Sequence, residues 1–142
     1  MDASYIAGFF DGEGSAMVIT VFIPERGISK RNTFLFRPTV TIAQKMPNIL
    51  IEIKAFLGYG IVLKAKTTGT HSLRVTGTKN VIDFVDRIGP YTVIKQQQLE
   101  RLKEMSLVKQ SHKANHPYTR VEIESFIDLR DAVYNANCWS RH

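Results

Sequence analysis

The stretch from Tyr5 to Ser15 reads Tyr-Ile-Ala-Gly-Phe-Phe-Asp-Gly-Glu-Gly-Ser and is the most specific part of this chain. Its composition predicts a short helix over about Ser4 to Phe10, followed by a tight exit at the glycines. A glycine inside a helix costs stability relative to alanine, so Gly8 indicates a packing reason. Small residues at helical spacing let two helix backbones approach closely. The stretch therefore predicts a helix–helix contact that leads directly into two acids, Asp11 and Glu13.

Asp11 and Glu13 would contribute to a shared site if two copies of the chain pack through this helix. The ends of the two helices then bring two acidic turns side by side, and carboxylates held close repel each other unless a cation lies between them. Hard cations such as Mg²⁺ bind carboxylates, backbone carbonyls and water. The stretch thus predicts a dimer contact joined to a metal site, and the simpler alternative is a pair of solvated turn acids.

Length and composition indicate one domain over residues 1–142 with a basic surface. The chain carries 19 Lys and Arg against 13 Asp and Glu, a net charge of +6, which favours a polyanionic partner such as nucleic acid. With 44% hydrophobic residues the chain can form a core, whereas a disordered chain would be poorer in them. No apolar run approaches the roughly 20 residues of a membrane span. The single cysteine, the scattered histidines and the lack of a signal peptide favour a reducing, intracellular location.

The pattern after the first helix alternates between strands and helices. Strands are expected over Met17–Ile23, Thr33–Ala43, Ile61–Thr67 and His71–Thr76, and helices over Asn48–Leu57, about Thr78–Ile88, Val93–Lys109 and Thr119–Asn135. The order begins with αββαββα, and the helix over Val93–Lys109 and a C-terminal helix over Thr119–Asn135 follow it. It predicts an α+β fold in which helices back a curved, four-stranded antiparallel sheet.

Alternation along the strands predicts one cationic, polar face of the sheet. The side chains expected on it are Arg37, Thr39, Thr41, Lys64, Lys66, Ser72 and Arg74. Arginine and lysine on a curved sheet can read guanine in a DNA major groove, and serine and threonine reach several base edges. A solvated face without a ligand is the alternative.

The stretch from Tyr5 to Ser15 resembles the signature of the LAGLIDADG homing endonucleases, and αββαββα is also that family's core. Ile6 stands where leucine is usual, and Glu13 stands where the final acid is often aspartate. The resemblance implies that Glu13 binds metal with help from the Gly12 carbonyl, and that Asp11 is structural. It also implies that Gln44 orients water, that Lys95 lies beside the metals, and that the dimer contact uses Ile6, Ala7, Gly8 and Phe9.

One motif supplies half of what an enzyme that cuts both DNA strands needs, so the resemblance implies a homodimer. The lack of splicing-domain residues favours an intron-encoded or a free-standing chain. The expected activity is Mg²⁺-dependent hydrolysis of both strands, leaving 3′ overhangs, at a long pseudo-palindromic site in double-stranded DNA; Mn²⁺ or Ca²⁺ can substitute in vitro. A basic loop with Arg26, Lys30 and Arg31 is expected to reach outer bases or phosphates. One alternative on the same fold is an intron RNA maturase. Others are a DNA-binding regulator, which should lack the acid at position 13, and an RNA-binding sheet, which should expose aromatic side chains.

Overall fold

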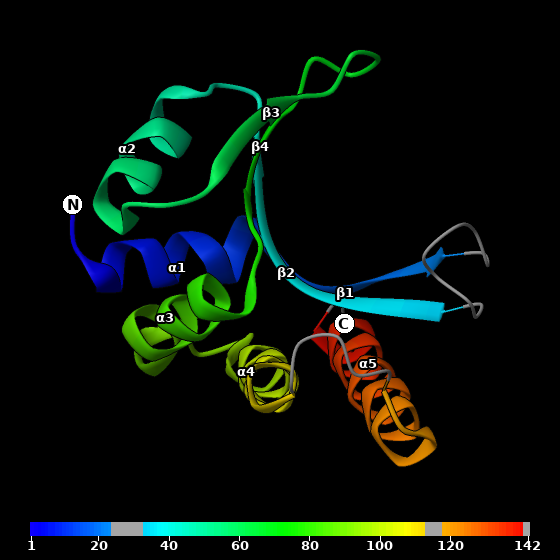
Figure 1. Ribbon diagram of the computed structural model, residues 1–142. Helices are drawn as coiled ribbons and strands as arrows, with labels where there is room; N and C mark the ends of the chain where they lie inside the picture. The colour runs from blue at the N-terminus through cyan, green and yellow to red at the C-terminus, as the bar shows by residue number, and fades with distance from the viewer. Residues whose placement is uncertain (24–32, 113–117, 141–142) are drawn as a thin grey trace.

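The computed structural model describes residues 1–23, 33–112 and 118–140 and has the expected order of elements (Figure 1). The elements are α1 (Ala3–Glu13), β1 (Gly14–Ile23), β2 (Thr33–Gln44), α2 (Asn48–Leu57), β3 (Ile61–Lys64), β4 (His71–Val75), α3 (Thr78–Ile88), the short 3₁₀ helix η1 (Gly89–Tyr91), α4 (Gln96–Ser111) and α5 (Arg120–Ser140). The α+β class and the antiparallel sheet are therefore confirmed.

The four strands form one sheet in the order β1-β2-β4-β3, and every neighbouring pair is antiparallel. Figure 1 shows a strongly curved sheet with the helices on one side and the other side open. Gly14 pairs with Ile42, and Val40 pairs with Val75. This register directs the apolar side chains of the central strands toward the helices, as expected for a sheet with one buried face.

The core lies between the sheet and α1, α2, α3 and α4. Ile6, Ala7 and Phe10 place α1 in this core, each with no exposed surface. The Phe10 ring meets the Phe84 ring of α3 edge to face, with 5.5 Å between centroids. A second cluster, in which Phe126 packs against Phe36 and Met105, fixes α5 to the sheet and α4. Both clusters hold their helices on the same side of the sheet, which leaves the other side free.

The first helix is longer than predicted, because it continues through the acidic turn to Glu13. Gly14 follows as the C-cap, and its N–H donates to the Phe10 carbonyl. A Cβ at Gly14 would lie 2.0 Å from Phe10 Cδ2, so glycine is needed there for close packing. The helix therefore runs into β1 without a loop, and Glu13 sits at the junction.

The second hairpin is shorter than predicted, because β3 ends at Lys64 rather than Thr67. The Ala65 N–H donates to the Thr70 carbonyl over 2.9 Å and closes a turn. Gly69 in this turn has φ of 67°, a left-handed conformation that suits glycine. Lys66 consequently belongs to the exposed turn and not to the sheet.

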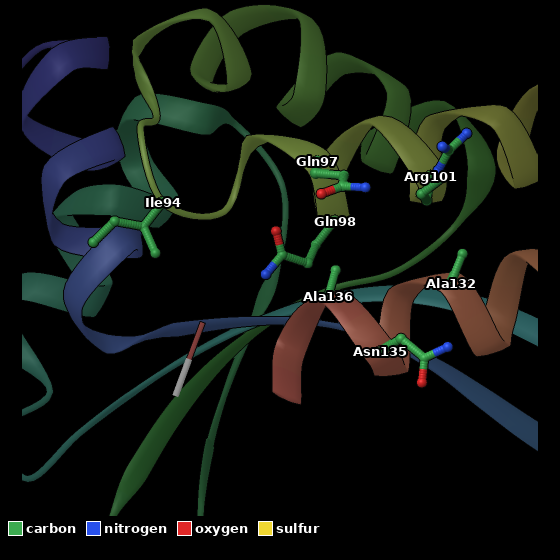
Figure 2. Close-up of a pocket in the computed structure, with 7 residues that line it drawn as sticks. All are labelled: Ile94, Gln97, Gln98, Arg101, Ala132, Asn135 and Ala136. Carbon is green, nitrogen blue, oxygen red and sulfur yellow. The ribbon is translucent and has the colours of Figure 1, made fainter. Parts of the chain in front are cut away.

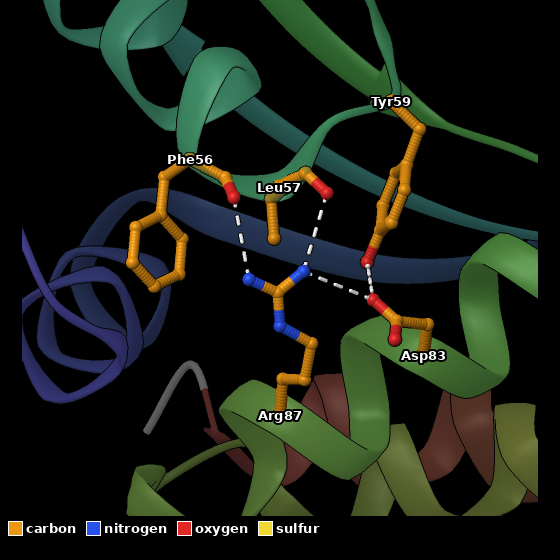
Figure 3. Close-up of polar contacts among 5 residues, drawn as sticks. All are labelled: Phe56, Leu57, Tyr59, Asp83 and Arg87. Carbon is orange, nitrogen blue, oxygen red and sulfur yellow. Dashed lines mark hydrogen bonds and ion pairs between the residues drawn. The ribbon is translucent and has the colours of Figure 1, made fainter.

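Arg87 of α3 ties down the C-terminal end of α2 (Figure 3). Its guanidinium donates to the carbonyls of Phe56 and Leu57 and to Asp83, each over 3.2 Å. Asp83 also accepts a 2.5 Å hydrogen bond from the Tyr59 hydroxyl. The last carbonyls of a helix have no partner within it, so this network satisfies two of them and connects α2 to α3.

Across the three described ranges, no helix combines the length and the apolar character needed to cross a membrane.

Candidate functional site

Glu13 is the last residue of α1, and its side chain is exposed. The final carbonyls of a helix lack intrahelical partners and carry the negative end of the helix dipole. The exposed carboxylate and these carbonyls, including that of Gly12, form a set of oxygen donors. Such donors are the ligands that Mg²⁺ and Ca²⁺ use in proteins, so the residues fit a hard divalent cation.

Asp11 has a different task, because both of its carboxylate oxygens accept backbone hydrogen bonds. One accepts from Val93 N–H over 2.7 Å and the other from Lys95 N–H over 3.1 Å. These contacts join the end of α1 to the segment before α4. The helix α4 starts at Gln96 rather than at Val93, directly after the two amides that Asp11 binds. Asp11 therefore positions Lys95.

The Lys95 ammonium lies against the end of α1. It donates to the Phe10 carbonyl over 3.2 Å and also to the Gly14 carbonyl. Partial burial lowers the pKa of Lys95, while the negative charges of Asp11 and Glu13 act in the opposite direction. The side chain thus places a positive charge beside the acidic turn, at the point where the helix dipole is negative.

Gln44 reaches the same end of the sheet from β2. It is the last residue of that strand, it is half-buried, and it lies two positions beyond Ile42, the partner of Gly14. Three separate elements therefore bring the predicted residues toward the α1–β1 junction: α1 carries Glu13, β2 ends in Gln44, and the segment before α4 carries Lys95.

One copy of the chain supplies few acidic metal ligands. In the part of the chain that the structure describes, no three His, Cys, Asp or Glu side chains cluster as metal ligands would. The Asp11 carboxylate is already occupied by two amides, which leaves Glu13 and the carbonyls. A divalent cation with six or more oxygen ligands needs further donors from another molecule or from water.

The exposed side of α1 differs from the predicted dimer contact. Ile6 and Ala7 have no exposed surface and pack inside the protomer, so they cannot touch another chain. Helical spacing instead exposes Tyr5, Gly8 and Gly12, with Phe9 partly exposed. A Cβ at either glycine would meet nothing within 4 Å. The open face of α1 therefore carries two glycines beside the stacked rings of Tyr5 and Phe9.

The register also corrects the predicted cationic face of the sheet. Arg37, Thr41, Ser72 and Arg74 do lie on the open side. Lys64 pairs with His71 and so lies on the helix side, because the edge strand β3 directs Ile61 and Leu63 to the open side. Ile61 and Leu63 are 55% and 42% exposed, although the solvent-facing side of a sheet usually carries polar residues.

Thr39 shares the open side but is inaccessible, with no exposed surface. Its hydroxyl donates to the Arg37 carbonyl over 3.1 Å. Thr39 is therefore a structural residue of the central strand rather than a ligand contact. Arg26, Lys30 and Arg31 of the predicted basic loop lie outside the described residues.

One residue near the site was missed by the sequence analysis. Asn137 of α5 donates to the Ala16 carbonyl over 2.8 Å and lines a pocket together with Gly12 and Lys95. A lone asparagine near the end of a helix carries no signal in the sequence, because only the packing of α5 along β1 brings it to the acidic turn.

A cavity of about 470 Å³ adjoins the site between α4 and α5 (Figure 2). Gln98, which is 1% exposed, and Ala136 lie on its two sides. Ile94 lines both this cavity and the pocket at the acidic turn. The C-terminal helix therefore forms one wall of the region around the site.

Comparison with known proteins gives a family and a fold. A family model described as LAGLIDADG endonuclease matches residues 6–106. The homing endonuclease I-CvuI, solved with the I-CreI target, superimposes with a TM-score of 0.79 at 20% identity over 94% of this chain and 80% of that one. The archaeal intron-encoded I-Vdi141I, solved with DNA, gives 0.62 at 19% identity over 96% of both chains. For I-GzeII, solved with its DNA target, the TM-score is 0.71 at 20% identity over 92% of this chain but 44% of that one. No curated protein sequence matches.

Proposed function

Because the chain belongs to the LAGLIDADG endonuclease family, we propose that it is a site-specific, Mg²⁺-dependent DNA endonuclease that works as a homodimer. The observation that carries this proposal is the junction of α1 and β1. There, the exposed Glu13 ends α1, and Asp11 and the carbonyls at the end of α1 hold Lys95 against the same turn. Gln44 ends β2 two residues beyond Ile42, which pairs with Gly14 at this junction.

Two arguments support a homodimer. One copy offers a single free acid at the junction, so two copies related by a two-fold axis would supply a symmetric pair. The chain also spans less than half of I-GzeII, as expected if one chain of that protein holds two such units. We assign the contact to Tyr5, Gly8, Phe9 and Gly12, which share one face of α1 and each have exposed surface.

The site residues have distinct roles in phosphodiester hydrolysis. Glu13 and the Gly12 carbonyl would hold a divalent cation, which supplies Lewis-acid stabilisation of the phosphate charge. Lys95 faces the charge that develops on the reacting phosphate, held in place by Asp11 and by the two carbonyls at the end of α1. Gln44 can donate to or accept from a water molecule, because its amide carries both functions.

We assign DNA recognition to the open side of the sheet. Its curvature suits the major groove, and Arg74, Thr41 and Ser72 offer donors and acceptors for base edges. Ile61 and Leu63 lie beside them and can contact thymine methyl groups. We further propose that the chain cleaves a pseudo-palindromic site and leaves 3′ overhangs.

The test compares cleavage and binding by Glu13→Gln with the wild-type chain, on DNA that spans candidate intron-insertion sites, with Mg²⁺ and with EDTA. The variant should lose Mg²⁺-dependent double-strand cleavage but keep binding, because glutamine preserves the size of the side chain and removes its charge. Glu52→Gln, at an exposed position of α2, is the matched control and should cut normally. Retained cleavage by Glu13→Gln would remove Glu13 from the mechanism. Tight binding of intron RNA by a wild-type chain that never cuts DNA would favour the maturase alternative.

A further inference from the structure

The strand β2 extends well beyond its neighbour β4. Pairing with β4 involves only the segment from Val40 to Gln44, so the part of β2 before Val40 has an edge that β4 does not cover. The Phe36 carbonyl in this part accepts a hydrogen bond from the ammonium of Lys109, which comes from α4. The next residue, Arg37, carries a second positive charge on an exposed side chain.

A cavity of about 400 Å³ lies where these two cations meet the start of α3. Its lining is Arg37, Pro38, Thr76, Gly77, Thr78 and Lys109, and this set of described residues contains two cations and no acid. Burial lowers the pKa of Lys109, and the nearby Arg37 charge lowers it further. Two like charges without a compensating acid repel each other, and an anion in the cavity would relieve that repulsion.

The other groups of the cavity are suited to an oxyanion. An ammonium has three donors, and Lys109 uses one of them on the Phe36 carbonyl. Thr76 and Thr78 add hydroxyls, and Thr78 begins α3, whose cap Gly77 provides no side-chain hydrogen bond. The first amides of this 11-residue helix supplement the two cations with further donors.

We propose that this cavity binds one backbone phosphate of duplex DNA, with Arg37 and Lys109 as its charged contacts. The inference rests on the proposed DNA-binding function and assigns Arg37 to the phosphate backbone rather than to the bases. Such a contact fixes the position of the protein on the duplex and carries no sequence information itself. Arg37 lies on the open side of the sheet and also lines the cavity, so a duplex on the open side can engage both.

The test measures the salt dependence of binding to two duplexes of unrelated sequence. Removing one phosphate contact should reduce the slope of log K against log [KCl] by about 1. Arg37→Gln and Lys109→Gln should each show this reduction, equally on both duplexes. Lys54→Gln, at an exposed position of α2, is the matched control and should keep the wild-type slope. Melting temperatures check that each variant is folded; Arg37 is exposed, so its replacement leaves the core intact.

If Arg37→Gln and Lys109→Gln keep the wild-type slope of log K against log [KCl], the proposal is overturned. A reduced slope on only one of the two duplexes would also overturn it, because such a difference indicates contacts to bases. If the wild-type chain binds neither duplex, the proposed function fails. NMR titration with inorganic phosphate then tests whether the cavity binds an oxyanion. Shifts of the Thr78 and Lys79 amides that vanish in Arg37→Gln would support an oxyanion site there. Absence of those shifts, or phosphate binding with unchanged DNA slopes, would overturn the assignment to the DNA backbone.

Discussion

Replacing Gly8 with alanine should make one protomer more stable and the homodimer weaker. Gly8 lies inside α1, and a Cβ at this position would meet nothing within 4 Å. Alanine is favoured over glycine in a helix interior by about 1 kcal/mol. The free energy of unfolding of the protomer should therefore rise by up to that amount, since no atom of the same chain opposes the added methyl group.

The dimer should respond in the opposite direction if α1 packs on its copy. Glycine lets two backbones approach closely, and the two-fold axis brings both added methyl groups into one contact. Overpacking of a close contact costs about 1–3 kcal/mol. The dimer Kd should rise roughly 5- to 150-fold at that cost.

Sedimentation over a range of protein concentrations measures association, and urea unfolding at low concentration measures the protomer. Gln110→Ala, at an exposed position of α4, is the control for helix propensity and should leave the dimer Kd unchanged. A Gly8→Ala chain that is more stable yet dimerises like wild type would refute the assignment of this face to the contact. A chain that becomes less stable as a monomer would refute the claim that the face is open.

Two other substitutions follow from the junction of α1 and β1. Gly14→Ala should lower the free energy of unfolding by about 1–3 kcal/mol, because its Cβ would lie 2.0 Å from the buried Phe10 ring, and urea unfolding checks this. Asp11→Asn should cost about 1–3 kcal/mol, since an amide oxygen cannot replace a carboxylate that accepts from two backbone amides. The same variant should reduce cleavage while leaving DNA binding near wild type, and an unchanged cleavage rate would contradict the positioning role of Asp11.

The elements of the fold could be predicted from local patterns. Pro24 and the basic loop separate the first two strands in the sequence, and the apolar spacing of Val81, Phe84, Val85 and Ile88 predicts the buried side of α3, all four of which are buried. Boundaries were less predictable where a distant residue decides them. The helix α4 begins at Gln96, and Asp11, more than eighty residues earlier, binds two of the preceding amides.

The faces of the sheet show the limit of local reasoning. Alternation predicts that Lys64 points to the open side, yet β3 is an edge strand whose register is set by its pairing with β4. A shift of one residue in pairing moves every side chain to the other face, so polarity alone cannot decide it. Thr39 occupies a position that the alternation of polar and apolar residues assigns to the exposed face, yet its side chain is buried.

By itself, the sequence determined the family and the order of the elements, because these depend on residue type and spacing. Tertiary structure alone decided which side of α1 is free, how Asp11 holds Lys95, and where Asn137, Arg37 and Lys109 lie. Those features arise from contacts between residues tens of positions apart, and their geometry follows from packing on one curved sheet. Burial of Ile6 and Ala7 in the protomer is the clearest case, because only the packing of α1 on the core decides which of its residues stay exposed.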